Sequence, residues 1–216
     1  MCEPTKANAN KVLDRLEKAH PDARVYLNFS SPLELLLATI LSAQCTDEKV
    51  NQVMPKVWEA FPTARDIADA EVADIEKVVR PTGFFRQKAK RLKEVSRAID
   101  EDFGGRVPDS MEALTMLPGI GRKTANVVLS GAMGKQAIAV DTHVHRVSQR
   151  IGLARAKDPD KLEAELCAII PESRRTRATQ LIGTHGRRIC GAKKPLCTEC
   201  CVNALCDYYG GRAKGA

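Results

Sequence analysis

The chain lacks any segment that would cross a membrane. No apolar run in its 216 residues approaches the ~18 residues that a transmembrane helix needs. The amino terminus, Met1-Cys2-Glu3-Pro4, carries no signal-peptide pattern. We therefore expect a soluble, cytoplasmic protein with no membrane partner.

The chain also lacks fixed-period repeats, low-complexity segments and any sustained alternation of apolar and polar residues that would predict strands. It contains instead many segments with apolar residues at helical spacing, separated by residues typical of helix ends. Its length suffices for one or two domains with real cores. These features predict an all-α protein of about ten helices in two lobes.

Acidic residues are fewer than basic ones. Lys and Arg number 34 against 27 Asp and Glu, which gives a formal charge of +7. This charge suits a polyanionic partner, although it is weak support by itself. The basic run from Arg86 to Arg97 is either a solvated helix face or a face that follows phosphates.

The segment from Leu33 to Ala43 is apolar almost all round, which predicts a buried central helix. Gln44 follows at its end, either as a plain turn residue or as a functional amide. Pro55 interrupts the next helical stripe and predicts a kink or two short helices. Phe84 lies in a loop with two aromatic residues, either as part of the core or at an exposed tip.

The segment from Leu117 to Ala125 reads Leu-Pro-Gly-Ile-Gly-Arg-Lys-Thr-Ala. Gly119 and Gly121 allow positive φ and a tight turn, and Ile120 can anchor that turn by packing inward. Helical segments flank it, the second from Arg122 to Ala132. The free N–H groups and positive dipole end of that helix would bind an anion. We interpret the segment as a helix–hairpin–helix that binds a nucleic-acid phosphate.

Two residues after this turn could carry chemistry. Lys123 would lie in the first helical turn, where the dipole disfavours a cation and so favours the uncharged, nucleophilic amine. Asp141 ends the apolar run Gln136–Val140 and has the sequence of a helix N-cap. Its carboxylate could take a proton or stabilise a nearby positive charge. The plain alternatives are a solvated surface lysine and a helix cap.

Four cysteines lie in a loop-rich tail with the spacing C-x6-C-x2-C-x5-C: Cys190, Cys197, Cys200 and Cys206. Disulfides are rare in an intracellular chain. Zinc sites tend to use two close pairs, whereas this tail has one. The graded spacing favours an iron–sulfur cluster, with zinc as the alternative. Cys201 is left out because consecutive residues do not easily reach one metal core.

These segments together resemble the endonuclease III family, the bifunctional DNA glycosylase/lyases of the helix–hairpin–helix Gly/Pro–Asp superfamily. The resemblance rests on Leu117–Asn126, on Val140-Asp141-Thr142-His143 and on the four-cysteine tail. Ser42-Ala43-Gln44 and Gly83-Phe84-Phe85 also match the family pattern, so the resemblance covers nearly the whole chain.

The resemblance implies a two-lobed helix–hairpin–helix DNA glycosylase fold. Residues 25–135 would form a six-helix barrel lobe, and residues 1–24 with 136–216 a four-helix iron–sulfur lobe, with a DNA cleft between them. The four cysteines of the tail would then hold a 4Fe-4S cluster. The expected partner is double-stranded DNA that contains a damaged pyrimidine or an abasic site, and the expected state is a monomer.

The family resemblance also implies the reaction, which is base excision of oxidised or ring-saturated pyrimidines followed by β-elimination. Lys123 is then the nucleophile that forms a Schiff base with the sugar, and Asp141 stabilises the cationic sugar and moves protons. Residues of the hairpin and of other segments are expected to bind DNA: Leu117, Gly119, Ile120, Gly121, Arg122, Gln44, Phe84, His143 and Lys194.

Two rival functions are considered beside this one. A monofunctional glycosylase of the same fold, such as the mismatch adenine type, would lack a lysine at position 123. A non-enzymatic DNA-binding protein would have lost Lys123 or Asp141, and the chain has both. Cys45 and Cys201 depart from the family pattern, which affects the details of the pocket and of the cluster site.

Overall fold

The computed structural model describes residues 4–213, with side chains to residue 211, and this range is helical without a strand. The predicted all-α fold class is therefore confirmed. No helix in the range combines the length and apolar content of a membrane span. Residues 1–3 and 214–216, which were assigned to the cysteine-bearing lobe, lie outside the described residues.

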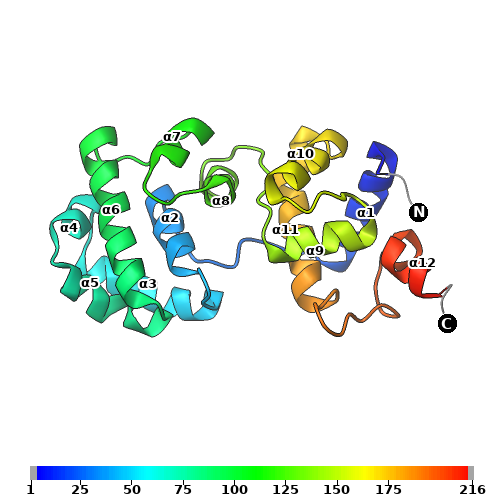
Figure 1. Cartoon of the computed structure of the whole chain (residues 1–216), viewed down its shortest axis with the longest axis horizontal. Coiled ribbons are helices and arrows are strands. Elements are labelled where there is room, and N and C mark those ends of the chain that lie inside the picture. Colours follow the sequence, from blue (N-terminus) through cyan, green and yellow to red (C-terminus); the bar gives the residue numbers. More distant parts are fainter. Residues whose placement is uncertain (1–3, 214–216) are drawn as a thin grey trace. The chain divides into compact units, whose positions relative to one another are not determined.

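Contacts divide the chain into two compact units, which we describe separately. The first unit, Tyr26–Lys135, contains the hairpin and is called the hairpin unit. Its elements are α2 (Pro32–Leu41), α3 (Asp47–Ala60), α4 (Ala64–Asp69), α5 (Val72–Val79), η1 (Arg80–Thr82), α6 (Phe85–Phe103), α7 (Met111–Met116) and α8 (Arg122–Ala132) (Figure 1).

The second unit joins the residues before Tyr26 to those after Lys135 and is called the cysteine unit. It brings the amino-terminal helix beside the carboxy-terminal part of the chain (Figure 1). Its elements are α1 (Lys6–Ala19), α9 (Thr142–Ile151), α10 (Pro159–Ile169), η2 (Glu172–Arg174), α11 (Arg175–Arg188), η3 (Asn203–Leu205) and α12 (Asp207–Ala213).

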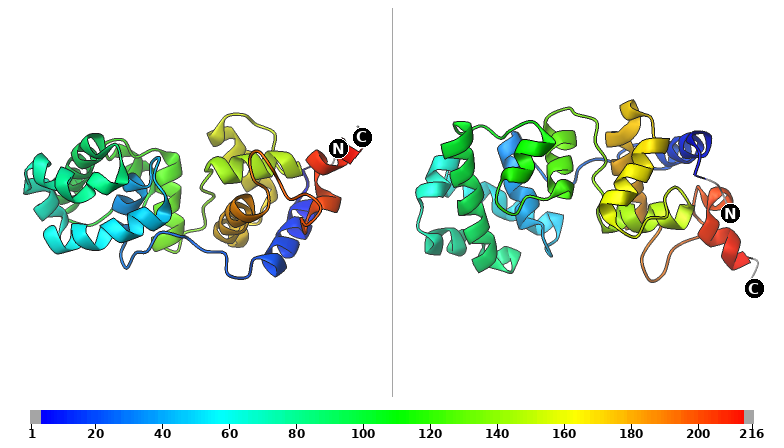
Figure 2. Two further views of the ribbon diagram at one scale, coloured as in Figure 1. Left: turned by 90° about the horizontal axis from the view of Figure 1, so that it is seen from below. Right: turned by 45° about the horizontal axis from the view of Figure 1, so that its top comes forward.

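The hairpin unit is organised around α2, as the apolar run predicted. Leu35, Leu36 and Leu37 are completely buried. A helix can bury all of its faces only when other helices surround it, and α2 packs against α3, α6 and α8. The views in Figure 2 agree that α2 lies beside α8. The second helix of the hairpin therefore rests directly on the core.

The helix that contains Pro55 does not break, so the predicted pair of short helices is wrong. α3 runs without interruption from Asp47 to Ala60. Thr46 caps its start by accepting a hydrogen bond from the backbone N–H of Lys49. Val50, Val53 and Val57 form its buried stripe. Burial of this stripe outweighs the one backbone hydrogen bond that proline removes.

The cysteine unit is held together by an apolar core and by ion pairs that join α1 and the turn after it to η2 and α11. The core includes Leu13 and Leu16 of α1 and Leu181 of α11, and the tail cysteines pack against it. The ion pairs join Arg174 to Asp14, Arg177 to Glu17 and Arg188 to Asp22, with N–O distances of 2.8, 2.5 and 2.7 Å. The first helix of the chain is thereby fixed against the segment that precedes the cysteine tail.

Candidate active site and cysteine pocket

The hairpin between α7 and α8 is anchored by two buried side chains. Leu117 and Ile120 are only 2% and 5% exposed. The N–H of Ile120 donates a hydrogen bond to the carbonyl oxygen of Leu117 at 3.1 Å, which closes the turn. These two expected DNA-binding residues therefore support the turn from inside and offer a ligand only their backbone.

The two glycines of the hairpin have different roles, which corrects the sequence analysis. Gly119 has a φ of +66°, a conformation that favours glycine. A Cβ built there would lie 2.3 Å from the guanidinium carbon of Arg91, which covers the turn. Gly121 has an extended backbone at φ −93°, and a Cβ there would meet nothing within 4 Å. Positive φ is thus required at Gly119 alone.

Gly121 is the N-cap of α8, and no side chain caps this helix. Among the described residues, the backbone N–H groups of Gly119, Gly121 and Lys123 have no hydrogen-bond acceptor. Unpaired N–H groups at a helix start combine with the positive end of the helix dipole to attract anions. The turn therefore has the geometry of a phosphate site built from backbone groups.

Lys123 lies in the first turn of α8, directly beyond that anion site, and its side chain is exposed. No acidic residue occupies the first turn of α8 to neutralise it. Arg122 beside it is also exposed. The site thus combines two side-chain cations with unpaired N–H groups, and one of the cations is a primary amine.

Asp141 is the N-cap of α9, as its sequence position predicted. One carboxylate oxygen, Oδ1, accepts hydrogen bonds from the backbone N–H groups of His143 at 2.9 Å and Val144 at 2.7 Å. These bonds fix the carboxylate at the start of the helix. No described residue donates to Oδ2, so one oxygen of an immobilised carboxylate remains for chemistry.

His143, another expected DNA-binding residue, is half-buried beside Asp141. Its Nδ1 lies 3.2 Å from a guanidinium nitrogen of Arg146. Burial lowers the pKa of His143, and the nearby Asp141 charge opposes that effect only in part. The contact between the His143 imidazole and Arg146 joins two residues in the first turns of α9 and so helps to stabilise the start of this helix.

Gln44 and Phe84 share an unusual backbone conformation. They are the only non-glycine residues with positive φ in the described part of the chain, at +52° and +48°. Both are exposed, and Phe84 is 58% exposed. Strained residues of this kind cluster at functional sites. The structure thus favours an exposed tip for Phe84 over a core aromatic.

Lys88 lies near both of these loops, a feature that the sequence analysis missed. It was grouped with the charged face of α6, yet it is only 5% exposed. Its ammonium donates a hydrogen bond to the carbonyl oxygen of Thr82 at 2.8 Å, directly before the Phe84 loop. Burial lowers the pKa of Lys88, and the proximity of Cys45 partly offsets this effect.

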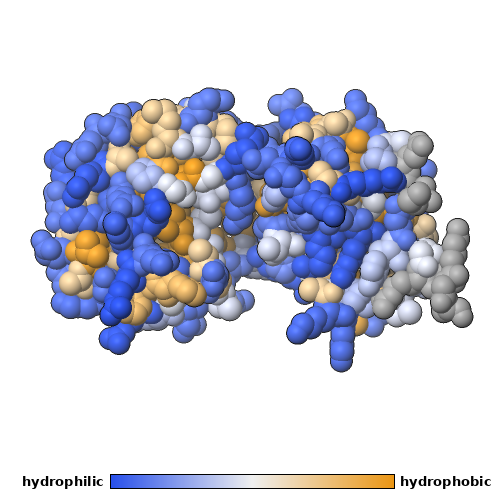
Figure 3. Space-filling model, viewed as in Figure 1, coloured by the Kyte–Doolittle hydropathy of each residue, from blue (hydrophilic) through white to orange (hydrophobic). Residues whose placement is uncertain are grey.

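Two of the large exposed apolar side chains belong to the hairpin unit and one to the cysteine unit. The large ones among the described residues are Phe84, Met116 and Leu196, and Met116 is 78% exposed. The face in Figure 3 is mainly hydrophilic, with apolar patches on the hairpin unit. Met116 is not among the site residues predicted from the sequence. Its signal would have been an apolar residue off the buried face of a short helix directly before the hairpin.

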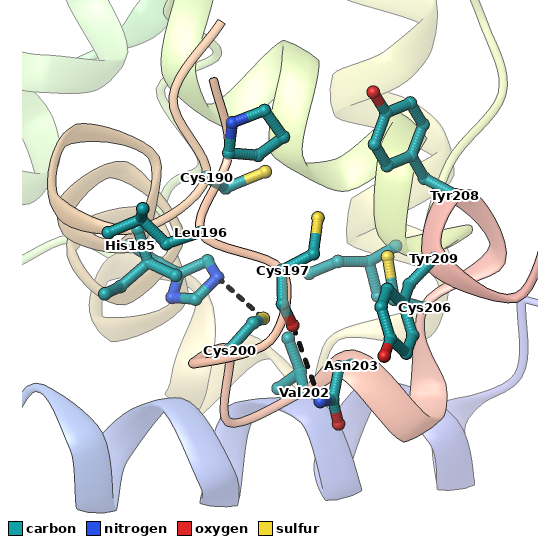
Figure 4. Close-up of a pocket in the computed structure, with 13 residues that line it drawn as sticks. His185, Cys190, Leu196, Cys197, Cys200, Val202, Asn203, Cys206, Tyr208 and Tyr209 are labelled. Carbon is teal, nitrogen blue, oxygen red and sulfur yellow. Dashed lines mark hydrogen bonds between the residues drawn. The ribbon is translucent and has the colours of Figure 1, made fainter. Parts of the chain in front are cut away.

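The four cysteines of the tail line one pocket in the cysteine unit. Figure 4 shows Cys190, Cys197, Cys200 and Cys206 around this pocket, whereas Cys201 is not among the lining residues. No described group of three or more potential ligands is arranged to hold a single metal ion.

The four cysteines of this pocket are half-buried. Burial raises the pKa of Cys200 to about 11, and the neighbouring thiols add to the effect. Burial also raises the pKa of Cys206. Four thiolates in such a place require compensating positive charge, which a metal group would supply. The donor set thus fits an iron–sulfur cluster.

Two arginines of α9 hold the first cysteine loop in place, and the sequence analysis did not identify them. Arg146 donates hydrogen bonds to the carbonyl oxygens of Cys190 and Gly186 at 3.1 and 2.9 Å. Arg150 donates to Gly191 at 2.7 Å and lies 3.6 Å from the Cys190 sulfur. Their spacing of four residues, which places both on one helix face, was the available signal.

The remaining predicted DNA-binding residue, Lys194, lies in the loop between Cys190 and Cys197 and is exposed. A Cβ added at Gly191 would lie 3.3 Å from the backbone carbonyl oxygen of Lys194, so the loop folds back closely on itself. The ammonium of Lys194 is thus presented to solvent from a loop whose base is fixed by α9.

Comparison with known proteins agrees with this geometry. A family profile described as "HhH-GPD superfamily base excision DNA repair protein" matches residues 37–172. Endonuclease III of Synechocystis sp. is 47% identical over 202 residues, which cover 93% of this chain and 92% of the relative.

Two solved structures are similar over almost the whole chain. They are titled "Structure of a non-covalent Endonuclease III-DNA Complex" and "Structure of a Trapped Endonuclease III-DNA Covalent Intermediate: Estranged-Adenine Complex". Each has a TM-score of 0.91 and 38% identity, and the match covers 97% of this chain and 99% of the other. The chain therefore belongs to the HhH-GPD superfamily of base excision DNA repair proteins, and within it to the endonuclease III family.

Proposed function

We propose that this protein is a base-excision-repair DNA glycosylase that removes oxidised or ring-saturated pyrimidines from duplex DNA and then cuts the strand 3′ to the abasic site. The observation that carries the proposal is the position of Lys123, an exposed primary amine in the helical turn that follows an unpaired backbone anion site. This position would hold a DNA phosphate and a nucleophile in fixed register.

The chemistry at Lys123 follows from its amine. The uncharged nitrogen attacks C1′ of the sugar, and the base leaves with the electron pair of its glycosidic bond. Cleavage of the C1′–O4′ bond then opens the sugar ring: O4′ takes up a proton, and the Lys123 nitrogen, which has given up a proton after its attack, forms a Schiff base with C1′. Loss of a proton from C2′ then expels the phosphate at C3′, which is the β-elimination that cuts the strand.

Asp141 would support these steps through its second carboxylate oxygen. The bonds to the start of α9 hold the carboxylate still, so Oδ2 can face developing positive charge on the sugar without reorganising. The same oxygen can accept a proton and return it. Since Asp141 and Lys123 belong to different units, the proposal requires the duplex to contact both.

Gln44 and Phe84 are proposed to enter the duplex where the damaged nucleotide leaves the base stack. Removing a nucleotide from the stack costs a few kcal/mol. An amide can hydrogen-bond to the base that remains, and an exposed ring can stack on its neighbours. Their positive φ values support this role because such strain persists where function requires it.

We also propose that Cys190, Cys197, Cys200 and Cys206 hold a 4Fe-4S cluster. When bound, the cluster crosslinks the tail to itself and supplies the positive charge that four buried thiolates need. Arg146 and Arg150 keep the Cys190 loop in the position that this binding requires. In this proposal the cluster shapes the tail around exposed Lys194 and takes no part in the bond changes.

The proposal is tested by borohydride trapping on duplex DNA with an abasic site. Borohydride reduces a Schiff base and fixes the DNA to the amine. Lys123→Gln should abolish trapping and strand cleavage while duplex binding remains, since the phosphate site is built from backbone groups. Arg122→Gln is the matched control, because it removes the adjacent charge but leaves the amine and should still trap.

Each alternative predicts a different result. Normal cleavage and trapping by Lys123→Gln would show that another amine performs the reaction. A wild-type protein that releases a base but never traps would be a monofunctional glycosylase. A protein that binds duplex DNA but does neither would be a binding module.

A further inference from the structure

Two histidines and a cysteine from three separate segments form a continuous line of contacts in the cysteine unit. His20 caps the end of α1, His185 belongs to the last turn of α11, and Cys200 lies in the tail. His20 Nε2 is 3.0 Å from His185 Nδ1. His185 Nε2 is in turn 3.4 Å from the Cys200 sulfur, the contact drawn in Figure 4.

Both imidazoles are removed from solvent. His20 is 5% exposed and His185 is 1% exposed, and their ring centroids are 5.3 Å apart. The contact between His20 Nε2 and His185 Nδ1 is a hydrogen bond only if one of these nitrogens carries a proton and the other does not. An imidazole with one proton has one donor nitrogen and one acceptor nitrogen.

Metal binding by Cys200 would determine which nitrogen donates and which accepts in each of these two contacts. Its sulfur is then a thiolate, which has no proton and can only accept. His185 Nε2 must carry the proton to make the contact, and His185 Nδ1 becomes an acceptor. His20 Nε2 must then donate to that nitrogen. The distances and the donor count leave one consistent arrangement.

We infer that His20 and His185 form a hydrogen-bond relay that holds an N–H on the Cys200 sulfur and thereby sets the reduction potential of the bound cluster. This inference rests on the cluster assignment in the proposed function. His185 makes the contact, and His20 is a positioning residue that acts through it by fixing the tautomer.

The consequence for the cluster follows from charge. A donor on a ligand sulfur draws electron density from it and stabilises the more negative, reduced state, so the bond raises the reduction potential. The other contacts differ in kind. Cys190 lies near a charged guanidinium of Arg150, and Cys206 receives hydrogen bonds from the backbone N–H groups of Tyr208 and Tyr209. Cys200 is contacted by the backbone N–H of Val202 and also by an imidazole, whose donor depends on its tautomer.

The first experiment reads the tautomers directly. Holoprotein labelled with ¹⁵N-histidine is examined by long-range ¹H–¹⁵N correlation NMR, after its iron content is measured. The expected result is a proton on Nε2 of both His20 and His185. A proton on Nδ1 of His185 would overturn the relay, and a protein without iron would overturn the cluster assignment and the relay together.

The second experiment measures the midpoint potential of the cluster in holoprotein variants. His20→Leu cannot donate to His185 and should shift the potential to a more negative value. His20→Gln restores an N–H donor and should return the potential toward the wild-type value. His145→Leu removes another imidazole, one that contacts the Lys157 carbonyl, and should not shift it.

A structural role alone would give a different pattern. Equal shifts for His20→Leu and His20→Gln would show that the imidazole acts by filling space, and no shift for either would show that the relay has no effect. Both results refute the inference. If His20→Leu fails to retain iron, the tautomers of the wild type and the potential of His20→Gln still decide the question.

Discussion

Replacement of Gly119 and Gly121 by serine tests the hairpin with two changes of the same size, two residues apart. At Gly119 a side chain must adopt φ +66°, which costs about 1 kcal/mol. It must also displace the guanidinium of Arg91 from 2.3 Å, which disturbs the pair of Arg91 with Glu94 at 3.4 Å. We expect Gly119→Ser to lose about 1–2 kcal/mol in free energy of unfolding, or about 2–8 °C in Tm.

Gly121→Ser is expected to behave in the opposite way. Its extended backbone is the usual conformation of an N-cap, serine is a preferred N-cap residue, and no atom lies within 4 Å of the added Cβ. Its stability should change by less than about 0.5 kcal/mol or rise.

Thermal and urea unfolding measure both variants, and duplex titration measures binding. If the turn of Gly119→Ser changes conformation, one backbone N–H no longer reaches the phosphate. Loss of one charged hydrogen bond costs about 1.5–3 kcal/mol, so binding weakens about tenfold or more. Equal destabilisation by the two serines would refute the conformational argument.

Three further changes probe other parts of the chain. Asp141→Asn keeps the capping oxygen but removes the charge, so single-turnover kinetics should show a loss of about 10²–10⁴ with duplex binding retained. Lys88→Met removes the ammonium that holds the Thr82 carbonyl; it should slow excision from duplex DNA more than cleavage of single-stranded abasic DNA, whereas Lys90→Met on the exposed face should affect neither. Glu17→Gln tests pH dependence, because the arginine partner of Glu17 lowers the pKa of its carboxyl group. The stabilising contribution of Glu17 is fully present above about pH 4.5 and is lost as the pH falls through the pKa of Glu17 in the folded protein. Thermal unfolding of the wild type and of Glu17→Gln from pH 3 to 7 measures this loss.

The parts of the protein that sequence reasoning predicted well are those that depend on neighbours along the chain. The N-cap at Asp141 and the start of α8 at Arg122 follow from residue type and spacing, and the structure has both. The central helix α2 was predictable because an apolar run of that length must be buried. Local rules sufficed because a helix start needs partners only three or four residues away.

Other features depend on contacts between distant residues, and sequence reasoning missed them. Lys88 lies among charged residues in the sequence, which predicts an exposed helix face, yet it is buried and its ammonium donates a hydrogen bond to the carbonyl oxygen of Thr82. Pro55 predicted either a kink or a division into two short helices, and burial of the apolar stripe keeps α3 as one helix. The conformation of Gly121 could not be separated from that of Gly119 by sequence, because both glycines permit either sign of φ.

The surroundings of the tail cysteines also depend on contacts between residues that are distant in the sequence. The spacing of the four cysteines predicts the ligands, but it does not predict which groups surround their sulfur atoms. Those surroundings come from α1, through His20, and from α9, through Arg146 and Arg150. Since ion pairs fix α1 against η2 and α11, the amino-terminal helix must dock before His20 can reach His185. Correct assembly of the cysteine unit and the properties of the bound cluster should therefore change together when the α1–α11 contacts are weakened.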